Sequence, residues 1–176
     1  MLLDRDGVIN RSLVVDGRPV APRTLSEFRL LPDAGRNIAI LKRQGFKVAV
    51  VTNQPDVANG LIAPAELARM HGRLAPLGVD LVKVCMHAQD AGCSCRKPRP
   101  GMLLEAAVEL GIALGRSYMV GDRWSDVEAG RAVGCYTIRI ERRWANEKPS
   151  RADALVGSLG AAVKHILQQE AKRAKK

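Results

Sequence analysis

Aromatic side chains are scarce in this chain: two tryptophans, two tyrosines and two phenylalanines make up 3% of its 176 residues. None of them alternates with a basic stretch, so the sequence lacks the stacking platform typical of proteins that bind single-stranded nucleic acid. It also has no run of 18 apolar residues, and a charge stands at the fourth position. We therefore expect no transmembrane helix, no secretory signal, no nucleic-acid or membrane partner, and a cytoplasmic location.

Internal repeats, low-complexity tracts and linkers are missing too. A chain of this length that is 47% hydrophobic has the size of one globular domain, which buries roughly two thirds of its unfolded surface. We expect residues 1–176 to form a single domain and a monomer. Between Met1 and the first acidic residue there are only Leu2 and Leu3, so either the first strand is unusually short or the natural start lies upstream.

Basic residues outnumber acidic ones by 28 to 18, which gives a formal net charge of +10. Part of this excess lies in a basic C-terminal tail from about residue 170, which is most simply a frayed, solvated helix end. The rest fits a small anionic metabolite, because a positive field steers anions to a site. A nucleic-acid partner and a merely solvated surface are the alternatives. The basic residues of the tail are Lys172, Arg173, Lys175 and Lys176.

One pattern recurs along the chain: a helical stretch, a glycine, and then a β-branched run. The glycines are suited to end helices in the left-handed conformation. Runs such as VAVV lack polar alternation, which is typical of parallel strands covered on both faces. The sequence therefore predicts an α/β fold with a doubly wound, mainly parallel sheet. The four glycines are Gly45, Gly78, Gly111 and Gly134.

Polar side chains stand where three of the predicted strands end. Taken singly, each group has an ordinary structural explanation as a turn or a helix cap. The carboxyl ends of parallel strands meet at one edge of a sheet, however, so a doubly wound fold gathers all three groups around one crevice. The groups are Asp4-Arg5-Asp6 after the first strand, Thr52-Asn53-Gln54 after the second, and Asp122 with Asp126 after a later one.

The two carboxylates of the first group are two positions apart. In an extended segment Asp4 and Asp6 share a face, and they repel each other unless a cation relieves the repulsion. The arrangement therefore indicates a metal or a phosphate site.

A second cluster has the spacing C-x-H-x5-C-x-C and consists of Cys85, His87, Cys93 and Cys95. Four such ligands suit tetrahedral Zn²⁺ with no open position, which indicates a structural zinc site in a loop of residues 85–95, the cysteine loop. A disulfide or a redox role is the alternative. The fourth cysteine, Cys135, is predicted to be a core residue.

Four stretches together resemble the ordered motifs of the haloacid dehalogenase (HAD) phosphatase superfamily. They are DRDGVIN from Asp4, Thr52-Asn53-Gln54, Arg96-Lys97-Pro98, and GDRWSD from Gly121 to Asp126. The stretch CRKPRPGMLL and the cysteine cluster resemble more narrowly the subclass IIIA D-glycero-D-manno-heptose-1,7-bisphosphate 7-phosphatases. The histidinol-phosphate phosphatases have a similar cluster. The resemblance implies a Rossmann-like core, and the short spacing between the motifs leaves no room for a large cap domain.

The resemblance also implies a mechanism. Asp4 would be the nucleophile that forms an aspartyl phosphate, and Asp6 the general acid and base. Mg²⁺ would be held by Asp4, Asp122 and the main-chain carbonyl of Asp6. Thr52 and Lys97 would hold the phosphoryl oxygens.

The remaining roles concern the substrate and the surroundings of the metal. Asn53 and Gln54 would bind substrate, and Arg96 would recognise its second anionic group. Asp126 would orient Lys97 or a water of the metal. Loops would close the site, with candidates at residues 11–22, at residues 55–60 and in the cysteine loop.

The expected function is thus removal of the 7-phosphate from a heptose 1,7-bisphosphate. Two features leave the substrate and its anomer open. Asn59 stands where heptose phosphatases often carry arginine, and the stretch after Asn10 does not match their usual substrate loop. The short gap between His87 and Cys93 is closer to the histidinol-phosphate group, whereas Pro100-Gly101-Met102 favours the heptose group. The alternatives are a phosphatase for histidinol phosphate or another polyol phosphate and, in a different class, a zinc-stabilised binding module without turnover.

Overall fold

The computed structural model of the chain describes residues 1–142, 144 and 148–175. Its centre is a six-stranded sheet in the order β5-β4-β1-β6-β7-β8, in which every neighbouring pair is parallel. The predicted doubly wound, mainly parallel sheet is therefore confirmed. The strands are β1 (Leu2–Leu3), β4 (Ala49–Asn53), β5 (Leu81–Cys85), β6 (Tyr118–Gly121), β7 (Tyr136–Ile140) and β8 (Ala154–Val156).

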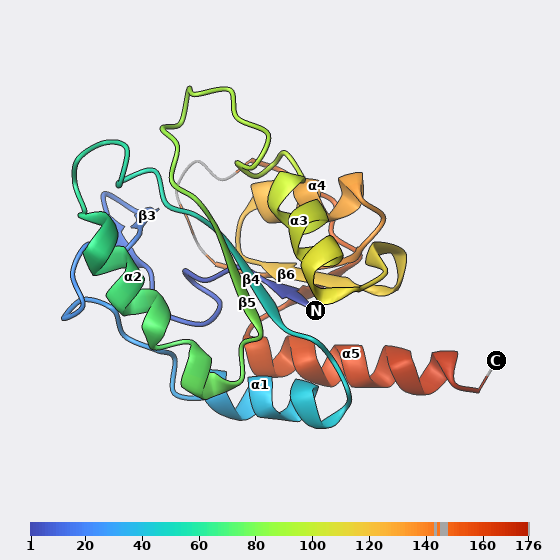
Figure 1. The fold of residues 1–176 in the computed structure, drawn as a ribbon. Helices are drawn as coiled ribbons and strands as arrows, with labels where there is room; N and C mark the ends of the chain where they lie inside the picture. The colour runs from blue at the N-terminus through green and yellow to red at the C-terminus, as the bar shows by residue number, and fades with distance from the viewer. Residues whose placement is uncertain (143, 145–147, 176) are drawn as a thin grey trace.

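Helices cover both faces of the sheet (Figure 1). Helices α1 (Ala34–Arg43), α2 (Pro64–Gly72) and α5 (Leu159–Arg173) share one hydrophobic cluster with the sheet, and α3 (Gly101–Leu110) and α4 (Trp124–Ala132) share the other. Neighbouring strand residues alternate between the clusters: Leu2 and Met119 face α3 and α4, whereas Leu3 and Val120 face the opposite side. Both strand faces are therefore buried, which explains why these strands lack polar alternation.

The connections from helix to strand contain the helix-ending glycines that the sequence pattern predicts. Two short 3₁₀ helices, η1 (Ala75–Leu77) and η2 (Leu114–Arg116), complete the connections into β5 and β6. All four predicted terminators have a positive φ, between 62° and 93°. They are Gly45, Gly78, Gly111 and Gly134.

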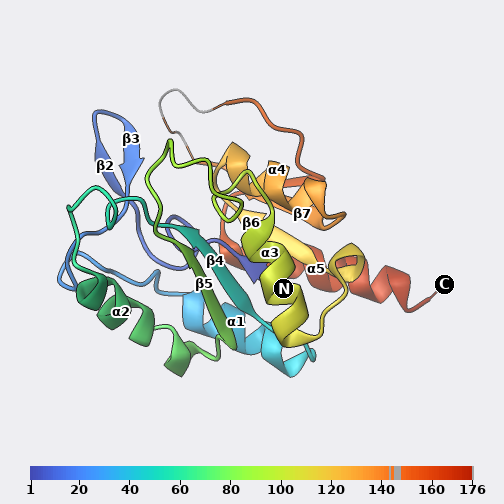
Figure 2. The same ribbon diagram turned by 45° about the horizontal axis from the view of Figure 1, so that its top comes forward.

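The structure also contains an antiparallel hairpin of β2 (Leu13–Val15) and β3 (Arg18–Val20), within a stretch predicted to be a loop. Asp16 and Gly17 at its tip both have positive φ, which is the backbone that a tight two-residue hairpin turn requires. Figure 2 shows this hairpin projecting above the carboxyl ends of the strands. Within the described residues, the insertions between strands are this hairpin, helices and loops, with no large cap domain.

Helix α5 continues into the basic C-terminal segment and ends at Arg173. Arg173 pairs with Glu170 at 2.8 Å, and its guanidinium carbon lies 5.3 Å from the centre of the Tyr118 ring. These contacts keep the last turn helical where the sequence predicts fraying. Lys176 lies outside the described residues. None of the helices that the structure describes is long and apolar enough to cross a membrane.

Candidate active site and metal centre

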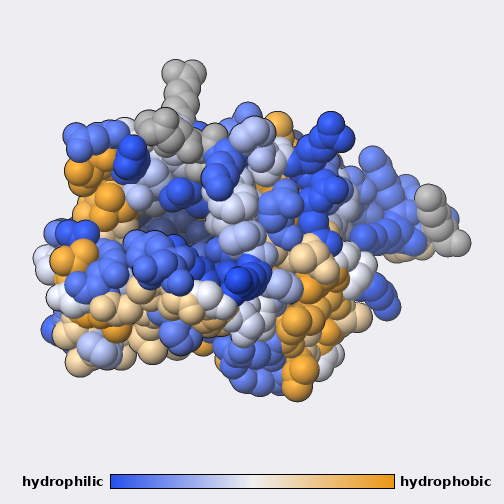
Figure 3. Space-filling model, turned by 90° about the horizontal axis from the view of Figure 1, so that it is seen from above, coloured by the Kyte–Doolittle hydropathy of each residue, from blue (hydrophilic) through white to orange (hydrophobic). Residues whose placement is uncertain are grey.

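A cavity of about 850 Å³ opens at the carboxyl ends of the parallel strands. Figure 3 looks onto this end of the molecule and shows a hollow surrounded mainly by hydrophilic residues. Loops from four parts of the chain line it: the β2–β3 hairpin, the segment after β4, the cysteine loop and the start of α4. Of the residues predicted from the motifs, it contains Asp4, Asp6, Thr52, Asn53, Arg96, Lys97, Asp122 and Asp126.

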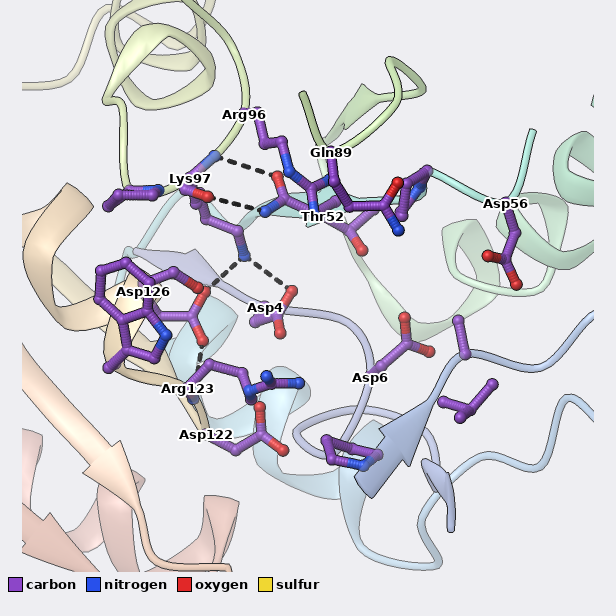
Figure 4. Close-up of a pocket in the computed structure, with 18 of the residues that line it drawn as sticks. Asp4, Asp6, Thr52, Asp56, Gln89, Arg96, Lys97, Asp122, Arg123 and Asp126 are labelled. Carbon is purple, nitrogen blue, oxygen red and sulfur yellow. Dashed lines mark hydrogen bonds and ion pairs between the residues drawn. The ribbon is translucent and has the colours of Figure 1, made fainter. Parts of the chain in front are cut away.

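Lys97 lies at the centre of this group (Figure 4). Its Nζ is 2.8 Å from Asp4 Oδ1 and 2.5 Å from Asp126 Oδ1, and it donates to the carbonyl of Val51 at 2.7 Å. The three charged residues are nearly inaccessible to solvent, with Lys97 4% exposed. The ammonium is therefore fixed between the ends of β1, β4 and α4 by residues distant in sequence.

Asp122 completes a group of three carboxylates. One oxygen from each of Asp4, Asp122 and Asp126 lies within 4.8 Å of the others. Asp122 packs directly on Gly7: a Cβ at Gly7 would lie 2.0 Å from Asp122 Oδ2, and Gly7 has a φ of +77°. The Trp144 indole Nε1 donates to that oxygen at 3.0 Å.

The charges in this group do not balance, because three buried carboxylates face one ammonium. Burial, and then the nearby Asp126, raise the pKa of Asp4 to about 7. Burial and the Asp4 carboxylate raise the pKa of Asp122 well above its usual range. Burial alone would lower the pKa of Lys97, but Asp126 and Asp4 raise it above its usual value. A hard divalent cation among these oxygens would relieve the repulsion, so the group fits Mg²⁺.

Asp6 is held differently from Asp4. Its carboxylate accepts hydrogen bonds from Arg5 at 3.0 Å, from Asn10 at 2.8 Å and from Gln54 at 2.7 Å. Arg5 is completely buried, although it lies between two acidic residues of the motif. The repulsion between the two carboxylates is thus relieved by two cations, Lys97 beside Asp4 and Arg5 beside Asp6.

Gln54 connects Asp6 with Thr52. Its Nε2 donates to Asp6 Oδ2 and, at 2.9 Å, to Thr52 Oγ1. Because the threonine oxygen accepts this bond, its own hydrogen can point into the cavity. Gln54 is 1% exposed and is not among the residues that line the cavity.

Asn53 and Arg96 occupy the side of the cavity nearest the cysteine loop. The Asn53 side chain makes two hydrogen bonds to the backbone of Lys97. Arg96 lines the cavity, and its Nη1 is buried without a hydrogen-bond partner among the described residues. A buried guanidinium nitrogen of this kind is suited to an anionic ligand.

The second predicted metal centre also assembles. Cys93 Sγ lies 3.6 Å from Cys85 Sγ and 3.5 Å from Cys95 Sγ, and His87 Nδ1 lies 3.2 Å from Cys95 Sγ. Burial and the adjacent thiols raise the pKa of Cys95 to about 12, since several thiolates cannot coexist so closely without a cation. The donor set could hold Zn²⁺ through His87 Nδ1 and three sulfurs.

Sequence reasoning missed three contacts around these residues. Arg99 donates to the carbonyl of Cys93 at 2.8 Å and so braces the cysteine loop. Trp144 binds Asp122, and His71 binds Arg5. The last two contacts join segments that only the fold brings together, and no local pattern indicates any of the three.

Comparison with known proteins gives concordant matches. The sequence matches the family model for haloacid dehalogenase-like hydrolases over residues 5–134. It is 40% identical over 147 residues to the D-glycero-beta-D-manno-heptose-1,7-bisphosphate 7-phosphatase of Pseudomonas aeruginosa, which covers 80% of each chain. It is 36% identical over 159 residues to the D-glycero-alpha-D-manno-heptose-1,7-bisphosphate 7-phosphatase of Mycobacterium tuberculosis, covering 80% of this chain and 78% of the relative.

A solved structure matches almost the whole fold. The D,D-heptose 1,7-bisphosphate phosphatase from B. bronchiseptica, complexed with magnesium and phosphate, superposes with a TM-score of 0.80 and 30% sequence identity. The match covers 96% of this chain and 98% of the other. On the family match, the identities and the shared fold, the chain belongs to the haloacid dehalogenase-like hydrolases.

Proposed function

We propose that this protein is a Mg²⁺-dependent phosphatase that removes the 7-phosphate of a D-glycero-D-manno-heptose 1,7-bisphosphate. One observation carries the proposal: the buried Asp4 carboxylate, at the end of β1, lies beside Lys97 and within ligand distance of Asp122. A nucleophile, a cation for phosphoryl oxygens and a metal ligand therefore converge at one point of the cavity.

The reaction proceeds in two displacements. An Asp4 oxygen attacks phosphorus, the ester P–O bond breaks, and the sugar oxygen that leaves takes a proton from Asp6. Water then attacks the aspartyl phosphate and gives its proton to Asp6, which frees Asp4 and inorganic phosphate. Asp6 suits this work because it lines the cavity while Arg5, Asn10 and Gln54 hold its carboxylate.

Magnesium, held by Asp4, Asp122 and the main-chain carbonyl of Asp6, would neutralise charge between the nucleophile and the phosphoryl group. Lys97 and Thr52 bind phosphoryl oxygens from the other side. Asp126 keeps Lys97 in place through their 2.5 Å ion pair. The relative from B. bronchiseptica, solved with magnesium and phosphate, supports this assignment.

The substrate class follows from the relatives and from the charge of the cavity. The relatives from Pseudomonas aeruginosa and Mycobacterium tuberculosis are named for the beta and the alpha anomer of heptose 1,7-bisphosphate. Arg96 would bind the phosphate that is not hydrolysed, because its Nη1 is buried and lacks a protein partner among the described residues. Asn53 contributes by fixing Lys97, and Gln54 by orienting Thr52.

The cysteine loop would bind one Zn²⁺ and serve a structural role. All four donor atoms are already converged, which leaves no position for substrate. The loop leads directly into Arg96 and Lys97, so its conformation determines the positions of both side chains. We expect the enzyme to act as a cytoplasmic monomer.

Phosphate release from purified protein tests the proposal. Both heptose 1,7-bisphosphate anomers and histidinol phosphate are offered with and without Mg²⁺, and ³¹P NMR identifies the phosphate that is lost. We expect Mg²⁺-dependent loss of the 7-phosphate, with one anomer preferred. Asp4→Asn abolishes turnover, while Asp56→Asn, which alters a cavity residue outside the carboxylate cluster, retains most of it.

Each of the other possible results would contradict a different part of the proposal. Turnover of histidinol phosphate alone would overturn the substrate and keep the mechanism. Loss of the 1-phosphate would reverse the assigned orientation of the substrate. Absence of turnover with every substrate, together with binding of the bisphosphate, would favour the non-catalytic binding module.

A further inference from the structure

The guanidinium of Arg5 joins the acid of the proposed mechanism to a histidine outside the cavity. Arg5 Nη2 donates to both oxygens of Asp6 at 3.0 Å, and Nε donates to Oδ1 at 3.2 Å. Its other terminal nitrogen, Nη1, lies 3.1 Å from His71 Nε2. Arg5 has no exposed surface, so these protein groups replace the water that would otherwise solvate the guanidinium.

Chemistry determines which group donates in the contact between Arg5 and His71. Arginine has donors only, so His71 Nε2 must accept, and the neutral ring carries its hydrogen on Nδ1. Burial, and then the Arg5 charge, lower the pKa of His71 to about 4, which agrees with a neutral imidazole. Asp6 is the other charged group that acts on His71.

Helix α2 supplies His71 from behind the site. His71 stands in the last turn of α2 and is not among the residues that line the cavity, so it does not touch the substrate. The Arg5 guanidinium carbon lies 5.4 Å from the centre of the buried Phe28 ring. Phe28 and His71 are therefore two groups, besides Asp6, that contact the Arg5 guanidinium.

We propose that His71 is a positioning residue for catalysis, which acts through Arg5 to fix the direction of the Asp6 carboxylate. The proposal rests on the function proposed above, in which Asp6 transfers the proton to the leaving oxygen. Without His71, Arg5 Nη1 loses its acceptor and the guanidinium can turn away from the bidentate pairing. Asn10 and Gln54 still hold Asp6, so the effect on catalysis is partial.

Three variants distinguish a positioning role of His71 in catalysis from a contribution of His71 to stability alone. His71→Leu removes the acceptor, and His71→Gln restores one, because its Oε1 can reach the position of Nε2. His165→Leu is the matched control, since His165 is also half-buried and bonded through Nε2, to Tyr136 under α5 and away from the cavity. All variants are compared at a temperature where circular dichroism shows them folded.

We expect His71→Leu to lower kcat for the sugar bisphosphate by about tenfold with KM nearly unchanged, because the lost interaction matters in the proton-transfer step. His71→Gln recovers most of the loss, and His165→Leu keeps the wild-type kcat. With p-nitrophenyl phosphate, whose leaving group needs little protonation, the decrease caused by His71→Leu is smaller.

An NMR measurement that needs no turnover tests the contact between Arg5 and His71 independently of the proposed function. The ¹⁵Nε signal of Arg5 should shift in His71→Leu and return toward the wild-type position in His71→Gln. An unchanged kcat in folded His71→Leu, or no rescue by glutamine, overturns the positioning role. An inactive wild-type protein with the expected NMR shifts would instead contradict the proposed function while keeping the contact.

Discussion

The Asn53 side chain holds the backbone of Lys97 by two hydrogen bonds. Asn53 Nδ2 donates to the Lys97 carbonyl at 3.0 Å, and the Lys97 N–H donates to Asn53 Oδ1 at 3.1 Å. The end of β4 is thereby linked to the segment that follows the cysteine loop. The position of the Lys97 ammonium consequently depends on an amide that makes no contact with the ammonium itself.

Replacing Asn53 with alanine should therefore impair catalysis through Lys97. We expect Asn53→Ala to lower kcat/KM by about 10- to 100-fold, because small displacements of a catalytic group have effects of this size. Loss of two hydrogen bonds should also reduce the free energy of unfolding by about 2 kcal/mol. Asn37→Ala, which removes two hydrogen bonds to Asp33 at the start of α1 and lies outside the cavity lining, is the control for steady-state kinetics and urea unfolding. Equal kinetic effects of the two variants would contradict this role of Asn53.

Gly7 and Gly45 offer a controlled test of the Asp122 position. Both have positive φ, but a Cβ at Gly45 meets nothing within 4 Å, whereas one at Gly7 would lie 2.0 Å from Asp122 Oδ2. Alanine should cost about 1 kcal/mol of backbone strain at either site. Only Gly7→Ala should also displace Asp122, and we expect it to raise the Mg²⁺ concentration for half-maximal activity by about tenfold or more. A magnesium titration of activity that is the same for both variants would show that the close approach is unimportant.

If the cysteine loop binds zinc as proposed, we expect activity to depend on this second metal. Removing zinc by a chelator, or by Cys93→Ser, should release the loop that positions Arg96 and Lys97. We expect a lower kcat/KM and a loss of about 3 kcal/mol, which corresponds to roughly 6–12 °C in Tm for a chain of this size. Cys135→Ala is the control because Cys135 lies in the core outside the cluster. Metal analysis that finds no zinc in active protein would exclude this dependence.

Much of the site could be predicted because parallel strands impose their own geometry. The register places Leu3 beside both Val50 and Val120, so the residues that follow these strands meet at one edge. Asp4, Thr52 and Asp122 converge for that reason alone. The cysteine cluster could be predicted equally well, because its four predicted ligands lie within eleven residues of sequence.

The parts that could not be predicted depend on long-range packing. No pattern in the sequence predicts that Arg5, which lies between two aspartates, is buried against His71, 66 positions away. The sequence likewise gives no sign that the Gln54 amide donates to both Asp6 and Thr52. The β2–β3 hairpin, in contrast, has a local signal in the turn dipeptide Asp16-Gly17, which follows Val14 and Val15.

His71 should also contribute a pH dependence to stability. Its pKa is about 4 in the folded protein and near 6.5 when unfolded, so the unfolded state binds more protons between these values. The stabilisation is complete above pH 6.5 and is lost as the pH falls toward 4. Allowing for solvent screening of a half-buried ring, we expect a loss of roughly 1 kcal/mol between pH 7 and pH 5. Because Asp4, with its raised pKa, changes stability in the opposite direction over this range, urea unfolding of the wild type must be compared with that of His71→Gln. A wild-type loss no greater than that of the variant would show that His71 is not the group responsible.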